Sequence, residues 1–203
     1  MTADPTVLSP EQRYAHLFDV ISSPRFLKMQ GLGNEVPFFI CSYPPRQAVE
    51  MSKMGKRLMG KLKSNGVQVL KINLYDLSIE LLCERGIWDR IIKVETTTPK
   101  DSLKELLQNV LDVERHLVPA MVEKMQAQPF DVLFISGVGE VFPYIRSHTV
   151  LNNLQSKAQN HPTVLFFPGS YTQSPEEGAS LDLFGRLHDD KYYRAFDIFD
   201  FQV

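Results

Sequence analysis

The chain has 203 residues, of which 43% are hydrophobic, so it is long enough to bury one substantial core. Its 22 basic and 24 acidic residues nearly balance, which excludes a protein that binds polyanions through bulk positive charge. The two cysteines, without a Cys-x-x-Cys or Cys/His cluster, argue against a disulfide scaffold or a structural zinc site. No apolar run nears the roughly 20 residues that span a bilayer, and no secretion-signal pattern is present. We therefore expect a cytoplasmic protein without membrane contact.

The first half of the chain alternates amphipathic segments with wholly apolar ones, which is typical of helices that cover a sheet. Ser9 and Gln12 can form a capping box, and Gly66 can adopt the left-handed conformation that ends a helix. The elements predicted here are a helix over 9–23, a strand over 36–43, a helix over 47–64, a strand over 67–74 and a helix over 76–85, with an irregular piece around Trp88.

The second half of the chain predicts one long helix and three further strands. An apolar stripe with helical spacing runs from Lys100 to Met125, and Asp101 or Ser102 could cap this helix. The other expected elements are a strand over 131–136, a helix over 143–157, a strand over 163–167 and a last strand over 192–199. Because the last strand follows a loop rather than a helix, it is expected as an antiparallel edge of the sheet.

These elements together predict the fold class. Short, wholly apolar strands that alternate with helices are typical of proteins whose mostly parallel sheet is covered on both faces. The sequence therefore predicts a single three-layer α/β domain over residues 1–203 with about five strands. Residues 168–203 are expected to form a C-terminal loop and the edge strand.

The first strand–loop–helix unit stands where nucleotide-binding folds keep their phosphate loop. Such a loop needs flexible glycines, whose N–H groups wrap the phosphates, and a Gly-Lys-Ser/Thr ending. Here Pro44 and Pro45 remove two donors, and that ending is absent. Gly137-Val-Gly139 lacks the third glycine of a dinucleotide fingerprint and is more typical of a tight turn. The unit is a degenerate, nucleotide-fold-like arrangement without a phosphate loop, so we expect no cofactor.

His188, Asp189 and Asp190 form a group that could hold a divalent cation in a metal-dependent hydrolase. Consecutive residues point in different directions, so such a site would need further ligands, for example Asp182 or His148. The alternative is a turn in which the aspartates accept local backbone N–H groups. No Gly-x-Ser-x-Gly elbow or Ser/His/Asp set is recognisable, so we assign no catalytic and no metal-binding residue.

Lys53, Lys56 and Arg57 lie on the polar face of the helix over 47–64 and are candidate nucleic-acid contacts. No aromatic residues interleave with them along this helix, and a lysine-rich face more often keeps a helix solvated. A nucleic-acid-binding module is therefore an alternative function, beside the metal-dependent hydrolase.

The C-terminal tail is acidic and aromatic, a composition that favours a protein–protein interface. The tail aromatics expected in the core are Phe184, Tyr192, Tyr193 and Phe196. Phe199 and Phe201, near the end of the chain, are instead candidates for docking onto a partner. The candidate partner-binding residues are Ser170, Tyr171, Asp182, Arg186, His188, Asp189, Asp190, Phe199 and Phe201.

Four segments in order carry a family resemblance that covers essentially the whole chain. They are Gly31–Tyr43 (GLGNEVPFFICSY), Leu133–His148 (LFISGVGEVFPYIRSH), Phe166–Tyr171 (FFPGSY) and Leu181–Phe196 (LDLFGRLHDDKYYRAF). With these segments the sequence resembles BrxB, the small component of BREX (bacteriophage exclusion) systems, and no clear departure from the family pattern is visible.

The resemblance implies a role in bacterial defence against phage, inside a multi-protein system. Such systems pair a DNA methyltransferase with a large ATPase and an alkaline-phosphatase-like protein called PglZ, and they mark host DNA and block phage DNA replication. The family offers no established catalytic residues to carry over. The resemblance thus implies a non-catalytic adaptor subunit that binds other BREX components, PglZ first, and associates with DNA only indirectly.

Overall fold

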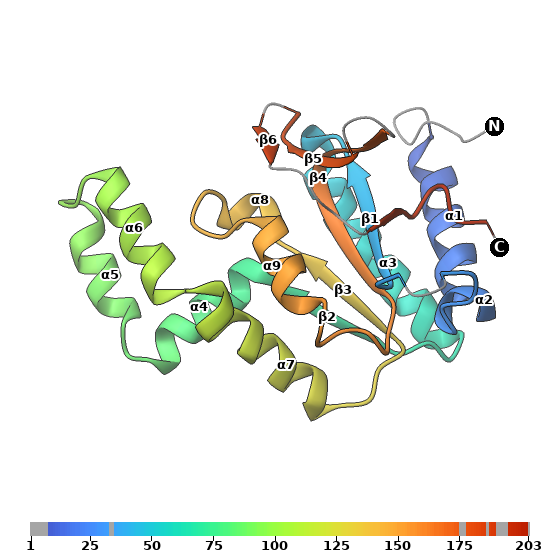
Figure 1. The fold of residues 1–203 in the computed structure, drawn as a ribbon, viewed down its shortest axis with the longest axis horizontal. Helices are drawn as coiled ribbons and strands as arrows, with labels where there is room; N and C mark the ends of the chain where they lie inside the picture. The colour runs from blue at the N-terminus through green and yellow to red at the C-terminus, as the bar shows by residue number, and fades with distance from the viewer. Residues whose placement is uncertain (1–7, 33–34, 175–177, 186, 190–194, 203) are drawn as a thin grey trace.

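The computed structural model describes residues 8–32, 35–174, 178–185, 187–189 and 195–202. Five strands pair in parallel in the order β2–β3–β4–β1–β7. Their bounds are β1 Phe38–Tyr43, β2 Val69–Asn73, β3 Val132–Ser136, β4 Thr163–Ser174 and β7 Phe196–Asp197. Helices lie on both faces of this sheet (Figure 1), so the predicted three-layer α/β fold is confirmed.

The alternation of side chains along the strands divides the core between the two faces of the sheet. On β1, Phe39 and Cys41 pack toward one group of helices, whereas Phe38 and Ile40 pack toward the other. The first group consists of α1 Pro10–Ser22, α2 Pro24–Leu27 and α3 Ala48–Ser64. The second consists of α4 Leu74–Glu84, η2 Val113–Leu117, α7 Val118–Ala127, α8 Val138–Val141 and α9 Ser147–Leu154. Burial on both sides explains the apolar runs Phe38–Cys41 of β1, Val132–Ile135 of β3 and Val164–Phe167 of β4.

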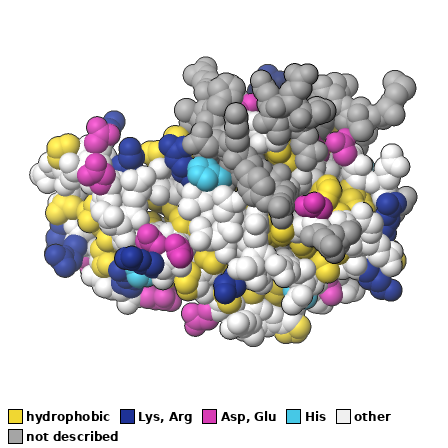
Figure 2. All heavy atoms as spheres, viewed as in Figure 1, with side chains coloured by type: hydrophobic (Ala, Val, Ile, Leu, Met, Phe, Trp, Pro, Cys, Tyr) yellow, Lys and Arg dark blue, Asp and Glu magenta, His cyan; other side chains and the backbone are white. Residues whose placement is uncertain are grey.

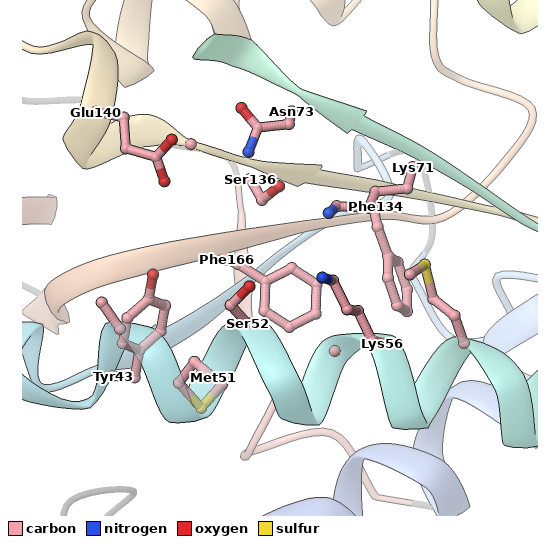
Figure 3. Close-up of a pocket in the computed structure, with 14 residues that line it drawn as sticks. Tyr43, Met51, Ser52, Lys56, Lys71, Asn73, Phe134, Ser136, Glu140 and Phe166 are labelled. Carbon is pink, nitrogen blue, oxygen red and sulfur yellow. The ribbon is translucent and has the colours of Figure 1, made fainter. Parts of the chain in front are cut away.

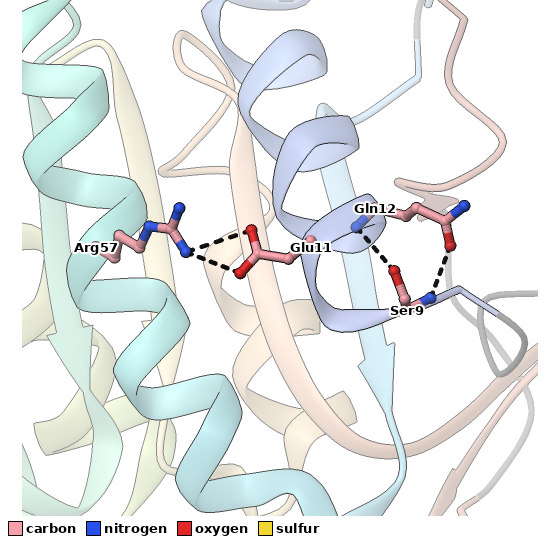
Figure 4. A network of polar contacts seen from close by, with 4 residues as sticks. All are labelled: Ser9, Glu11, Gln12 and Arg57. Carbon is pink, nitrogen blue, oxygen red and sulfur yellow. Dashed lines mark hydrogen bonds and ion pairs between the residues drawn. The ribbon is translucent and has the colours of Figure 1, made fainter.

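The local signals that place the first helices are confirmed. The N–H of Ser9 donates to Oε1 of Gln12 (3.0 Å) and the N–H of Gln12 donates to Oγ of Ser9 (3.3 Å), which forms the expected capping box of α1 (Figure 4). Gly66 follows α3 with φ of 83°, a conformation that glycine adopts without strain. Among the described residues, no helix combines the length and the apolar composition needed to cross a membrane.

The single long helix predicted over Lys100–Met125 is wrong. The chain forms α6 Lys100–Val110, turns, and continues as η2 and then α7. At the turn, a carboxylate oxygen of Asp112 accepts the N–H of Arg115 (2.7 Å). The Asp112 side chain therefore caps the start of a new helical segment. Because Asp112 lies within the predicted apolar stripe, the stripe is divided between two helices.

Two other expectations about this region are also wrong. Neither Asp101 nor Ser102 caps α6, because Pro99 occupies the N-cap position, where no side chain accepts a hydrogen bond. The segment around Trp88 is not irregular but forms α5 Trp88–Glu95, a short amphipathic helix. Helices α5 and α6 lie at the end of the molecule farthest from β1, shown at the left of Figure 1.

The C-terminal third also differs from its prediction in its boundaries. The helix predicted over 143–157 is confined to α9, because the chain is extended at Arg146 just before it. Strand β4 runs on beyond the predicted end at residue 167 and forms a hairpin with β5 Gly178–Leu183. Strand β7 lies at the edge as expected, but it pairs with β1 in parallel, with Phe196 opposite Phe39. The antiparallel pairing occurs in the β4–β5 hairpin instead, where the chain reverses.

Candidate functional site

A cleft of about 590 Å³, open to solvent, lies between α3 and the sheet near the carboxyl ends of β1, β2 and β3. In open α/β sheets this is where ligands bind. Tyr43 comes from the end of β1, Asn73 from the end of β2 and Ser136 from the end of β3. Figure 3 shows these three side chains around the space that α3 faces.

The cleft exists because small residues of α3 face the sheet. Gly55 lies in the interior of α3, where glycine is less favourable than alanine by about 1 kcal/mol. A Cβ atom added to Gly55 would find no heavy atom within 4 Å, so the space beside it is open. Ala48 and Ser52 continue this small-residue face toward the start of the helix. These small residues leave the space between α3 and the sheet unfilled.

The ends of β2 and β3 meet closely at the upper wall of the cleft. Oδ1 of Asn73 accepts the N–H groups of Tyr75 (2.8 Å) and Asp76 (3.2 Å) and so caps α4. Gly137 follows β3 with φ of 84°, and a Cβ atom there would collide with Oδ1 of Asn73. Glycine at this position allows the two strand ends to approach each other. The expectation of a tight turn at Gly137 is confirmed.

Charged groups lie at the two ends of the cleft. Lys56 from α3 and Lys71 from β2 approach it from opposite walls, and Glu140 lies toward the end at which Tyr43 stands (Figure 3). Within the described part of the chain, neither lysine forms an ion pair. Burial raises the pKa of Tyr43, so its hydroxyl stays protonated and can donate a hydrogen bond.

The cleft contains polar groups suited to binding rather than an evident catalytic constellation. The Oγ atom of Ser136 is buried and has no hydrogen-bond partner among the described residues. A buried hydroxyl without a hydrogen bond destabilises the folded state, unless a water molecule or a ligand forms that hydrogen bond. In the described ranges, no group of three or more His, Cys, Asp or Glu side chains lies close enough to hold a metal ion.

The structure describes only part of the predicted His188–Asp190 group. His188 and Asp189 belong to β6 Leu187–Asp189, where they are opposite Asp182 and Leu181 of β5. Asp190 and Arg186 lie outside the described residues. The metal-dependent hydrolase therefore stays an untested alternative.

The candidate partner-binding residues on the β4–β5 hairpin differ in exposure. Ser170 is exposed, and Asp182, opposite it, is half-buried and accepts the hydroxyl of Ser180 (3.2 Å). Tyr171 is buried, and its hydroxyl donates to the carbonyl oxygen of Ala195 (2.6 Å). Tyr171 thus ties the hairpin to the segment before β7, while Ser170 stands on the surface.

The terminal aromatic residues pack onto the N-terminal helices. Phe199 is buried and its ring stacks on His16 of α1 (centroids 5.5 Å apart). Phe201 is half-buried and contacts the rings of Phe26 and Phe39 edge-on. Because α1, α2 and the sheet already cover much of these rings, we do not include them in the contact surface proposed below.

Two of the four tail aromatics expected in the core are described. Phe196 is half-buried and contacts Phe39 (5.7 Å between centroids), whereas Phe184 is exposed and contacts only the edge of Phe142 among the described rings. The expectation for Phe184 is wrong, because it stands just past β5, where the sheet no longer covers it. Tyr192 and Tyr193 lie outside the described residues.

The predicted basic face of α3 is divided among different contacts. Arg57 forms an ion pair with Glu11 of α1 (3.2 Å; Figure 4), and its guanidinium lies over the ring of Tyr14 (4.2 Å). Lys56 lines the cleft, and both Lys53 and Lys56 are exposed. Helix α1 therefore supplies an aromatic neighbour and an ion-pair partner for Arg57 that the sequence of α3 alone did not reveal.

The sequence reasoning did not identify the most unusual surface, the pair of helices α5 and α6, which we call the α5–α6 arm (residues 88–110). No residue of α6 is buried, although its apolar residues lie on one face, and α5 buries only Ile91. Ile92 and Val94 of α5 are 46% and 38% exposed. Figure 2 shows apolar side chains among charged ones on the arm, at the left of that view. The apolar stripe was visible in the sequence, but its incomplete cover was not.

Comparison with known proteins identifies the family. The family model described as "BREX protein BrxB" matches residues 70–198, from β2 to β7. A Bacillus cereus (strain H3081.97) protein with that name is 34% identical over 193 residues, covering 93% of this chain and 97% of the relative. Its namesake in Escherichia coli O9:H4 (strain HS) is 27% identical over 186 residues, covering 92% and 90%. No solved structure matches the chain. The resemblance found in the sequence is confirmed: this protein belongs to the BrxB family of BREX proteins.

Proposed function

We propose that this protein is a non-catalytic adaptor subunit of a BREX phage-defence complex and that it binds another component through the α5–α6 arm. The observation that carries this proposal is the incomplete cover of the arm. An 11-residue amphipathic helix without a single buried residue is unusual in an isolated protein, since amphipathic helices normally bury their apolar stripe. An exposed apolar face of this kind is typical of a protein–protein contact.

The arm has the composition of an interface. Leu103, Leu106 and Leu107 form a stripe on α6 that is only half-buried. Ile92 and Val94 add exposed apolar area from α5. Burial of one such side chain contributes about 1–2 kcal/mol of binding free energy. Association costs roughly 4–15 kcal/mol in lost translational and rotational freedom. Several side chains offset this cost only if a partner covers the whole face. The proposal therefore requires an extended, apolar surface on the partner.

The first partner that we propose is PglZ, the component named by the family resemblance. A second contact is proposed at the β4–β5 hairpin, where Ser170 and Phe184 are exposed. The resemblance also implies that the complex acts in the marking of host DNA and the exclusion of phage DNA, with only indirect contact between this protein and DNA. The ion pair of Arg57 with Glu11, which occupies one of the three candidate nucleic-acid contacts, supports that view.

Co-purification of the tagged full chain with the other BREX components tests the proposal. We expect the wild-type protein to retain PglZ. The Ile92→Asp variant should retain about one tenth of that amount or less, because its carboxylate would be buried in an apolar contact. Val49→Asp is the matched control, since Val49 is a β-branched residue of another helix and is 69% exposed.

Circular dichroism should show that both variants fold, because both side chains are exposed. Equal retention of PglZ by the two variants would reject the arm as the docking surface. If the wild-type protein retains no other BREX component at all, the adaptor function itself is wrong.

A further inference from the structure

We propose that the cleft between α3 and the sheet binds a nucleoside monophosphate, with its phosphate at Lys56 and Lys71. The proposal concerns a different part of the molecule from the docking arm and does not depend on it. The ligand class follows from three features of the cleft: two exposed lysines that form no ion pair with a described residue, apolar walls and a polar opposite end.

The two lysines define an anion site. Lys71 lies in the middle of β2 between Leu70 and Ile72, on the strand face turned to α3, and it is opposite Phe134 in the neighbouring strand. Lys71 is exposed, because β2 is an edge strand of the sheet and Leu70 and Ile72 point to its opposite face. Lys56 approaches the same space from α3 (Figure 3), and neither lysine has an ion-pair partner among the described residues. A phosphate monoester, with nearly two negative charges at neutral pH, matches these two cations.

The walls of the cleft fit a flat organic body. Phe134 and Phe166 line it from the sheet, and Met51 and Met59 line it from α3. Aromatic rings and thioethers make favourable contacts with flat heterocycles. The open space beside Gly55 lies between these walls, so a base and a sugar have room there.

The opposite end of the cleft offers hydrogen bonds to the rest of the ligand. Ser136 has a buried hydroxyl to which no described residue is hydrogen-bonded, and Tyr43 has a protonated hydroxyl. Glu140 can accept from the amino or imino groups of a base. Its negative charge would repel a polyphosphate that extended along the cleft. The β1–α3 connection starts with Pro44 and Pro45, which donate no backbone hydrogen bonds. The site therefore suits one phosphate rather than three.

Calorimetric titration of the full chain with AMP, GMP, CMP and UMP tests the proposal. At least one of them should bind. In thermal denaturation, a concentration of that nucleotide ten times its dissociation constant should raise the Tm of the protein by about 3–6 °C. The nucleoside without phosphate and inorganic phosphate alone should each bind at least tenfold more weakly. Lys56→Gln and Lys71→Gln should each weaken binding by about tenfold or more, whereas Lys53→Gln, an exposed lysine of the same helix outside the cleft, should not.

Filling the cleft provides an independent test. Gly55→Leu should abolish binding, because the side chain would occupy the space between the walls. Gly60→Leu is the matched control: Gly60 also lies inside α3 with open space around it, but it does not line the cleft. Failure of all four monophosphates to bind at 5 mM, or unchanged binding in Gly55→Leu, would overturn the proposal. Binding of inorganic phosphate as tightly as any nucleotide would overturn it as well. The adaptor function would stand in each case.

Discussion

Helices α3 and α6 have similar apolar stripes but very different surroundings. Helix α3 packs on the sheet and buries Met51, Leu58 and Leu62, whereas α6 packs its apolar residues against the margin of the core and buries no residue. The stripe of a helix therefore indicates that one face avoids water, but the neighbouring elements decide how much of that face is covered. On α3 the remaining opening is a cleft beside Gly55; on α6 the apolar stripe stays half-buried.

The largest expected effect compares the same substitution on the two helices. Leu58→Ala should lower the free energy of unfolding by about 2–4 kcal/mol, because the side chain is fully buried and its removal leaves a cavity. Leu106→Ala on α6 should cost about 1 kcal/mol or less, since this side chain is only half-buried. Urea denaturation of both variants measures the difference, and equal losses would show that α6 is packed as tightly as α3.

The next prediction concerns the tight wall of the cleft. Gly137→Ala should destabilise the protein by about 2 kcal/mol or more, because it combines a left-handed backbone with a collision at Asn73. Gly66→Ala is the control, with nearly the same φ but open space around the added carbon, and it should cost about 1 kcal/mol. If denaturation gives the same loss for both, the contact with Asn73 has no energetic weight.

A smaller effect is expected from Asp197 at the edge strand. Burial, with a further contribution from Asp200, raises the pKa of Asp197 to about 6, above its usual 3.8. The folded state thus holds this proton more tightly than the unfolded state, and the resulting stability is complete below about pH 4 and is lost as the pH rises through about 6.

Asp197→Asn removes this titration and keeps an oxygen that can accept the N–H of Phe199. Between pH 4.5 and 7.5 the wild-type protein should lose about 1 kcal/mol more stability than the variant, a figure reduced to allow for solvent around a partly exposed carboxyl. Parallel pH profiles of the two proteins would contradict the raised pKa.

The smallest effect is expected from the contact between α1 and α3. Arg57→Ala should cost less than about 1 kcal/mol, because the ion pair with Glu11 is mostly exposed and only the contact with Tyr14 adds to it. Lys53→Ala, on the same helix and with no ion pair to any residue that the structure describes, should change stability by about 0.5 kcal/mol at most. A loss above 2 kcal/mol for Arg57→Ala would mean that this pair is a main support of the N-terminal layer.

Elements with strong local signals could be predicted from the sequence. The capping box at Ser9, the glycine after α3 and the apolar strands all depend on neighbouring residues, and each lies where expected. The predicted helix over 100–125 failed because Asp112 can either continue a helix or cap a new one, and only tertiary packing decides between them.

The candidate site depends on contacts between distant residues, so less of it could be predicted. Lys71 is visible in the sequence as a charge inside an apolar strand, but its proximity to Lys56 depends on the parallel register of β2 with β3 and on the path of α3. Likewise, Phe199 stands near the end of the chain and suggested a free ring, yet His16 of α1 covers it. In both cases the deciding neighbour is more than ten residues away in sequence.

Hydrogen–deuterium exchange on the full chain, alone and in the presence of PglZ, tests the adaptor proposal most directly. We expect backbone amides of α5 and α6 to exchange more slowly in the complex, because a partner that covers the apolar face stabilises both helices against local opening. Amides of β1 and β3 in the sheet centre should change little. If PglZ binds and protects other surfaces while the α5–α6 arm exchanges as in the free protein, the arm is not the docking surface.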